Sequence, residues 1–274
     1  MVSLLNMSWL SSYIYHNDTT QVLEHVRTCL KKLNLITGKD HQFFFIRYRD
    51  DGLHIRLRIL SSEEDHPLIK RLLEEHLPYP LKYVPYIPEV ERYGNVQTID
   101  LAERHFHAAS VLILEWLNHP GSHYIIAIKA HVAMFSAMAL EPANIIQVCD
   151  NFINNWIKVL FKKELPWKEQ YEQYMQIFHS AFLQYEPGLT SAISSYLESI
   201  NMVEQEPVLQ EFMKTSTAVI NGYRNILGEQ EKINSILESL IHMNNNRSGI
   251  LNRDEAFVLF LVKQCIISVY ETDN

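Results

Sequence analysis

The most informative alternation of hydrophobic and polar residues lies between Phe43 and Ile59, in FFFIRYRDDGLHIRLRI. Two alternating runs flank Asp51-Gly52, where glycine supplies the positive φ of a tight two-residue turn. The pattern therefore predicts a β-hairpin with one apolar face. On the other face, the register set by this turn places Arg47, Arg49, His54, Arg56 and Arg58.

This cationic face needs an explanation, because like charges opposite each other on a sheet cost about 0.2–1 kcal/mol per pair. One interpretation is a solvated outer face, with arginine stems along the surface and nearby carboxylates neutralising the charge. The other is a site that holds a carboxylate or phosphate through bidentate guanidinium groups. The residues of the hairpin alone leave both open.

The surrounding pattern predicts an α+β fold, with a small antiparallel sheet near the N-terminus packed against a larger, mostly helical body. A strand is expected at residues 9–16, and a helix capped by Asp18 or Thr19 before the hairpin. The proline- and tyrosine-rich residues 77–95 must run extended. Helices follow from a capping box at Asp100 and Glu103, with breaks at later prolines that include Pro187.

A single domain over residues 1–274 is expected, made of a sheet-containing part (1–97) and a helical part (98–274). The formal net charge of -8 disfavours a general nucleic-acid-binding role. Three isolated cysteines suit a reducing compartment, and neither a signal peptide nor a membrane span is recognisable. We expect a cytoplasmic protein with no membrane contact. Dinucleotide, P-loop, hydrolase and zincin motifs are absent, and no metal site is predicted.

Two further stretches carry candidate chemistry. PEVERYG places Glu89 and Arg92 in the extended segment, and its simplest interpretation is a surface salt bridge. SLIHMNNNR closes a predicted helix, where the dipole favours a protonated His242. From these residues alone, an ordinary histidine at a helix end is a better explanation of the second stretch than a catalytic one.

These pieces together resemble a known family. Trp9, the HxRxR motif of the hairpin, PEVERYGN followed by Ala102-Glu103, Phe106 and Ser110, and the late HMxxNR motif resemble the C-terminal domain of lantibiotic dehydratases, also called the thiopeptide-type bacteriocin biosynthesis domain. The resemblance extends from about Ser8 to the last helix. One departure is Asn95, where the family commonly has RYGG.

The resemblance implies a lyase without a cofactor. In this family a glutamylation domain esterifies Ser and Thr of a precursor peptide with glutamate from glutamyl-tRNA, and the elimination domain expels the glutamate, leaving dehydroalanine or dehydrobutyrine. Carried over by motif, the catalytic residues are Arg58, Arg92 and His242. The residues expected to bind or support the substrate are Arg56, Glu89, Arg47, His54 and Tyr93.

The implied partners are the glutamylated precursor peptide and a separate glutamylation protein, without direct need for nucleic acid; a homodimer is left open. Two other functions are considered. Thiopeptide pyridine synthases of the same fold family join two dehydroalanines in a formal cycloaddition and eject the leader peptide. A non-catalytic partner could instead bind peptide or glutamyl-tRNA through the basic face.

Overall fold

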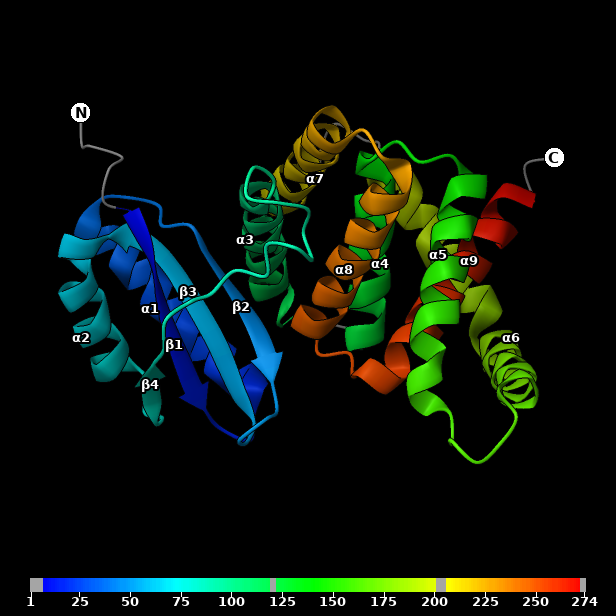
Figure 1. Cartoon of the computed structure of the whole chain (residues 1–274), viewed down its shortest axis with the longest axis horizontal. Helices are drawn as coiled ribbons and strands as arrows, with labels where there is room; N and C mark the ends of the chain where they lie inside the picture. Colours follow the sequence, from blue (N-terminus) through cyan, green and yellow to red (C-terminus); the bar gives the residue numbers. More distant parts are fainter. Residues whose placement is uncertain (1–6, 119–121, 201–205, 272–274) are drawn as a thin grey trace. The chain divides into compact units, whose positions relative to one another are not determined.

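The computed structural model describes residues 7–118, 122–200 and 206–271 (Figure 1). The chain divides into two compact units, residues 1–119 and 120–274. This division falls later than residue 97 because the helix α3 (Ile99–Trp116) packs along a strand of the first unit. The predicted α+β class is confirmed, with a four-stranded antiparallel sheet near the N-terminus. That the whole chain acts as one elimination-type domain stays a prediction.

The sheet of the first unit has the strand order β2-β3-β1-β4. Its strands are β1 (Met7–Tyr15), β2 (Phe43–Tyr48), β3 (His54–Ser62) and the short edge strand β4 (Leu81–Tyr83). The predicted first strand is confirmed as β1. One face of the sheet is buried under α1 (Thr19–Thr37), beside which α2 (His66–His76) packs. As predicted, Asp18 caps α1, since its carboxylate accepts from the backbone N–H groups of Thr20 and Gln21.

The predicted hairpin is confirmed, but its register is wrong by one residue. Tyr48 pairs with His54, so the loop comprises residues 49–53 rather than Asp51-Gly52 alone. Phe45 consequently pairs with Leu57 and both are fully buried beneath the sheet, whereas the two-residue turn would have set Phe45 beside Arg58. A one-residue slip exchanges the faces of a strand, so burial of the apolar pairs decided the register.

This slip corrects the position of Arg47. It pairs with Ile55 on the buried face, opposite to the face of His54, Arg56 and Arg58, and Arg49 lies in the loop. The Arg47 guanidinium donates to the hydroxyl oxygen of Thr19 at 2.5 Å, at the start of α1. Burial lowers the pKa of Arg47 to about 10, while Asp18 favours its charged form. Arg47 therefore joins α1 to β2 and is not part of the outer face.

Helix α3 covers the edge of β2. The backbone N–H of Phe45 donates to the Ser110 hydroxyl at 3.2 Å, and His107 Nδ1 lies 3.1 Å from the backbone nitrogen of Phe43. The predicted capping box is wrong: Thr98 is the N-cap without a side-chain hydrogen bond, and Glu103 accepts instead from the indole N–H of Trp9. Glu103 is thus held by tertiary contacts, which local sequence does not reveal.

The second unit is helical in its described residues. It comprises α4 (His123–Ala137), α5 (Pro142–Trp156), α6 (Trp167–Ile200), α7 (Pro207–Leu227), α8 (Gln230–Ser248) and α9 (Asn252–Glu271), with a 3-10 turn at Ile157–Leu160. In the parts of the chain that the structure describes, no helix has the length and apolarity needed to cross a membrane.

Two predicted helix ends in the second unit are wrong. Helix α6 continues through Pro187, because buried residues such as Phe182 and Ile193 extend its apolar face on both sides of the proline. Helix α8 continues beyond His242 to Ser248 and ends at Gly249, whose φ of 84° is the left-handed C-cap conformation. His242 is therefore not at a helix end, and the dipole argument for its charge fails.

The anchoring role of Arg47 can be tested by its replacement. Arg47→Met should lower the free energy of unfolding by about 1–3 kcal/mol, because the threonine hydroxyls lose a buried charged donor. Arg47→Lys, which keeps the charge and one donor, should cost less. Urea denaturation followed by circular dichroism measures both. Equal stability of Arg47→Met and wild type would contradict the anchoring role.

Candidate functional site

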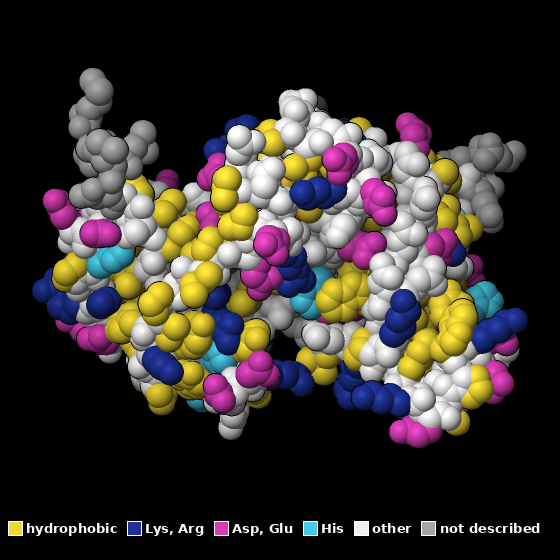
Figure 2. Space-filling view, in the orientation of Figure 1, with side chains coloured by type: hydrophobic (Ala, Val, Ile, Leu, Met, Phe, Trp, Pro, Cys, Tyr) yellow, Lys and Arg dark blue, Asp and Glu magenta, His cyan; other side chains and the backbone are white. Residues whose placement is uncertain are grey.

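The outer face of the sheet combines aromatic and basic side chains. Strand β1 contributes Trp9, Tyr13 and Tyr15 to it, directly alongside Leu60, Arg56 and His54 of β3. We call this surface the aromatic–arginine face; it consists of Trp9, Tyr13, Tyr15, Phe44, Tyr48, His54, Arg56 and Arg58. Over β1 and β3, Figure 2 shows apolar side chains surrounding a few basic ones. This face therefore carries fewer cations than predicted, because Arg47 and Arg49 lie elsewhere, and it carries more aromatic rings.

Arg58 is the most deeply buried cation of this face, with 6% of its surface exposed. Its guanidinium carbon lies 5.5 Å from the ring centroid of Phe44 and 5.2 Å from that of Tyr86. Nη1 donates to the backbone oxygen of Arg56 at 3.1 Å, but Nε has no hydrogen-bond partner among the described residues. Among the described residues no carboxylate lies within ion-pair distance of Arg58.

Burial lowers the pKa of Arg58 to about 10, against weaker contributions from Tyr86, Tyr13 and, smallest, Glu89; the charge of Arg56 adds to the lowering. The guanidinium is still protonated at neutral pH. A buried charge without a counter-ion is costly, whereas the same charge beside a bound anion gains charge-assisted hydrogen bonds. A bound anion would therefore supply Arg58 with charge-assisted hydrogen bonds that the described residues do not provide.

Arg56 and His54 form a second group on the same face. The Arg56 guanidinium carbon stands 3.3 Å from the ring centroid of Tyr48 and 4.6 Å from that of Tyr13. Arg56 Nε donates to His54 Nε2 at 3.1 Å, and His54 Nδ1 lies 2.8 Å from the carbonyl oxygen of Gly52. These contacts require a neutral imidazole, in agreement with a pKa of His54 that burial and then the two arginine charges lower. His54 therefore orients Arg56.

Glu89, Arg92 and Tyr93 form the turn that leads into α3. Arg92 Nη1 donates to Glu89 Oε2 at 3.0 Å, with side chains 33% and 63% exposed, so the pair stabilises the fold by under about 1 kcal/mol. Tyr93 is buried and packs edge-on against Phe106, 5.0 Å between ring centroids. The buried ring of Tyr93 thus fixes the turn, and the neighbouring Arg92 stays partly exposed at the surface.

Asn95 fits this turn without strain. Its Oδ1 accepts from the backbone N–H of Gln97 at 2.8 Å, and its own N–H donates to the Thr98 hydroxyl at 2.8 Å. Its φ is not positive. The departure from the glycine common in the family therefore keeps an ordinary turn.

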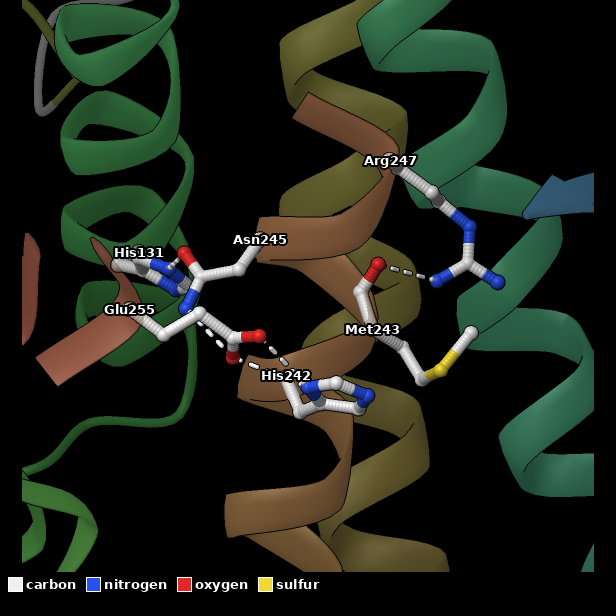
Figure 3. A network of polar contacts seen from close by, with 6 residues as sticks. All are labelled: His131, His242, Met243, Asn245, Arg247 and Glu255. Carbon is white, nitrogen blue, oxygen red and sulfur yellow. Dashed lines mark hydrogen bonds and ion pairs between the residues drawn. The ribbon is translucent and has the colours of Figure 1, made fainter. Parts of the chain in front are cut away.

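His242 lies in a buried polar network of the second unit (Figure 3). Its Nδ1 stands 3.0 Å from both carboxylate oxygens of Glu255, which is completely buried in the first turn of α9. Asn245 donates to the same carboxylate at 3.3 Å and accepts from His131 Nε2 at 2.8 Å. The chain of contacts thus runs His131, Asn245, Glu255, His242.

This network determines which nitrogen of His242 can react. Glu255 holds Nδ1–H, while Nε2 points away from the carboxylate in Figure 3 and has no hydrogen-bond partner among the residues that the structure covers. The imidazole ring also stacks on Trp156, 4.2 Å between centroids. A carboxylate that fixes one imidazole nitrogen leaves the other with a lone pair, as acid–base catalysis requires.

The predicted site residues are distributed over both units. Arg56, Arg58, Glu89 and Arg92 belong to the first, with Arg56 and Arg58 on one face of the sheet, and His242 belongs to the second. In the described ranges no cluster of three or more His, Cys, Asp or Glu side chains is arranged for a metal.

Sequence reasoning missed Glu255 and Tyr86. Glu255 shares the buried face of α9 with Val258, Leu259 and Val262, so an acidic residue on an apolar helical face was the available signal. Tyr86 was one of several tyrosines in the extended segment, and nothing in the sequence singles it out.

These observations define an α+β protein with a buried arginine on an aromatic face in one unit and a carboxylate-oriented histidine in the other. The chain belongs to the lantibiotic dehydratase C-terminal family: the profile described as "Lantibiotic biosynthesis dehydratase C-term" matches residues 9–266. The resemblance drawn from the motifs is therefore confirmed.

Curated relatives agree. The chain is 23% identical over 268 residues to the nisin biosynthesis protein NisB of Lactococcus lactis subsp. lactis, covering 93% of this chain and 25% of NisB. It is 22% identical over 241 residues to the epidermin biosynthesis protein EpiB of Staphylococcus epidermidis, covering 82% of this chain and 22% of EpiB. The chain thus spans about a quarter of the length of these relatives.

Solved structures share the fold. The pyridine synthase TbtD from thiomuracin biosynthesis superposes with a TM-score of 0.69 at 14% identity, over 96% of this chain and 99% of TbtD. TsrL superposes with a TM-score of 0.71 at 13% identity, over 97% of this chain and 96% of TsrL. The tRNA-dependent lantibiotic dehydratase MibB from Microbispora sp. 107891 superposes with a TM-score of 0.64 at 20% identity, over 97% of this chain and 28% of MibB. At these identities the likeness concerns the fold alone.

The role of Glu255 in fixing the His242 tautomer can be observed directly. In wild type we expect the neutral ring to carry its proton on Nδ1, and in Glu255→Ala to shift toward the Nε2–H form that predominates in free imidazole side chains. Nitrogen-15 chemical shifts of the histidine ring measure the two populations. Glu255→Gln, which still offers an oxygen acceptor, should stay closer to wild type. Unchanged tautomers in Glu255→Ala would refute the assignment.

His131 should make the protein sensitive to acid. Burial lowers its pKa to about 4, so between about pH 6.5 and pH 4 the unfolded state binds a proton that the folded state does not. Stability is therefore lost as pH falls through this window, by up to about 3 kcal/mol at 1.4 kcal/mol per pKa unit. Urea denaturation at several pH values should show a weaker pH dependence in His131→Gln. The matched control is the exposed His179, whose replacement should leave the dependence unchanged.

Proposed function

We propose that this chain eliminates glutamate from glutamylated Ser or Thr side chains of a ribosomal precursor peptide, leaving dehydroalanine or dehydrobutyrine. The observation that carries the proposal is the buried Arg58 guanidinium, which has an unused Nε–H and no carboxylate within ion-pair distance in the described part of the chain. A glutamyl ester brings one free carboxylate, and its departure creates a second. Both are ligands for guanidinium groups.

The reaction requires a base and charge stabilisation. The base removes the α-proton of the esterified residue, the electron pair forms the Cα–Cβ double bond, and the Cβ–O bond breaks to release glutamate. In the proposed mechanism His242 Nε2 takes the proton, because Glu255 fixes its other nitrogen and stabilises the imidazolium that results. Proton abstraction beside a carbonyl group builds an enolate, and a cation aimed at such an oxygen is typically worth about 3 kcal/mol.

The arginines have separate roles in this proposal. Arg58 binds the glutamyl carboxylate against Phe44 and Tyr86, and Arg92 stabilises the developing negative charge. Glu89 holds Arg92, and His54 holds Arg56 beside the substrate.

A separate glutamylation protein is the proposed partner. The curated relatives are about four times as long as the stretch that this chain matches, and one structural neighbour is a tRNA-dependent lantibiotic dehydratase. Binding to a glutamylated peptide, rather than to tRNA, is expected from the net charge of -8.

The proposal is tested by incubating the purified protein with a peptide that is already glutamylated on one Ser and following its mass. We expect loss of glutamic acid and formation of dehydroalanine. His242→Ala should lower kcat by about 10²–10⁴-fold, the range typical of a removed acid–base group. Arg58→Ala should lower kcat/KM mainly by raising KM, because the glutamyl carboxylate loses its cationic ligand. The matched control is Arg104→Ala, since Arg104 is an exposed arginine of the same unit that pairs with Asp100.

An unchanged peptide with the wild-type protein and its glutamylation partner present would refute elimination. A peptide with two dehydroalanines then tests for cycloaddition, since TbtD, which shares the fold, is a pyridine synthase. Salt-dependent binding that survives His242→Ala without any turnover would identify a non-catalytic partner.

A further inference from the structure

Three aromatic rings form a compact cluster beside Arg58. Trp9, Phe44 and Tyr86 meet edge-to-face, with centroid distances of 4.9 Å between Trp9 and Phe44, 6.0 Å between Trp9 and Tyr86, and 5.6 Å between Phe44 and Tyr86. We call these three rings the aromatic box. The guanidinium of Arg58 lies against two of its members, Phe44 and Tyr86. The position of the box therefore determines where the cation lies.

Glu103 ties two members of the box together. Its Oε2 accepts from the indole N–H of Trp9 at 3.1 Å, and its carboxylate also accepts from the hydroxyl of Tyr86. Trp9 comes from β1 and Tyr86 from the proline-rich segment, while Glu103 lies on α3. One buried carboxylate thus joins three segments that are distant in sequence.

The carboxylate of Glu103 does not neutralise Arg58. It forms no ion pair with that guanidinium, and its hydrogen bonds go to the two aromatic side chains. Burial raises the pKa of Glu103, which the hydrogen bonds from Tyr86 and then Trp9 counteract. A buried carboxylate used only to hold two rings leaves the neighbouring cation available for an external anion.

We infer that Trp9, Tyr86 and Glu103 are positioning residues that fix the Arg58 guanidinium for the glutamyl carboxylate. This inference rests on the proposed function. The Tyr86 ring restricts the guanidinium through a cation–π contact, and the hydrogen bond to Glu103 restricts the ring in turn. Apolar walls around the cation also exclude water, which strengthens its hydrogen bonds to a carboxylate.

The test measures binding of a peptide that cannot react. Its glutamyl group is attached through an amide to 2,3-diaminopropionate in place of Ser, and calorimetry compares it with the same peptide without the glutamyl group. Wild type should bind the glutamylated peptide more tightly, and Arg58→Ala should abolish the difference. Tyr86→Leu, which removes the cation–π contact, should lower the affinity for the glutamylated peptide by about 3–30-fold.

The hydroxyl and the carboxylate are tested separately. Tyr86→Phe keeps the ring but loses the hydrogen bond to Glu103, and should weaken binding of the glutamylated peptide by about 2–10-fold. Glu103→Gln, which keeps an acceptor, should lie between Tyr86→Phe and wild type. Tyr83→Phe is the matched control, because the Tyr83 hydroxyl bonds to Glu74 in another part of the same unit. It should bind both peptides as wild type does.

The effect must also appear in KM rather than in kcat, because a positioning residue for the carboxylate acts on substrate binding. Equal affinity of Tyr86→Leu and wild type for the glutamylated peptide would overturn the inference, as would a loss that is equal for both peptides. If wild type itself does not distinguish the two peptides, the proposed function fails and the inference with it. Discrimination by wild type that survives Tyr86→Leu overturns the inference alone.

Discussion

The outer face of the sheet in the first unit is built around the buried positive charge of Arg58. Arg58 lies on the aromatic–arginine face with 6% exposure, and within the part of the chain that the structure describes its Nε–H has no hydrogen-bond partner. A protein accepts the cost of such a group only where surrounding structure fixes it. Here β3 places the guanidinium, Phe44 and Tyr86 flank it, and the hydrogen bonds of Glu103 are directed to Trp9 and Tyr86. The outer face thus keeps this cation buried and, among the described residues, without a carboxylate partner.

The second unit orients a base by a related device. Glu255 enters the first turn of α9, where the helix dipole stabilises its negative charge, and it receives hydrogen bonds from Asn245 and His242. Both carboxylates, Glu103 and Glu255, are buried and both act on another side chain rather than on solvent. The chain belongs to the lantibiotic dehydratase C-terminal family. In the proposed elimination, Arg58 would bind the substrate and His242 would transfer the proton.

Much of the fold could be predicted because its signals are local. Asp is favoured at helix N-caps, so Asp18 predicts the start of α1. The alternation around Phe43–Ile59 identifies a hairpin. The prolines of residues 77–95 cannot donate backbone hydrogen bonds, so this segment cannot form a central strand throughout. Local signals failed where tertiary packing outweighed them. Helix α6 runs through Pro187 because its apolar face continues on both sides, and α8 passes His242 because Gly249, rather than the asparagine run, ends it.

For the candidate site, the sequence by itself determined the family and the residue types: paired arginines two positions apart on one strand, an acid–arginine turn and a late histidine. Only the tertiary structure decided which of them share a surface. The register moved Arg47 to the buried face, because a strand exchanges its faces with a single-residue slip and Phe45 and Leu57 had to be buried together. The partners of Arg58 and His242 are 28 and 13 residues away in the chain, at Tyr86 and Glu255, so no local pattern could identify them.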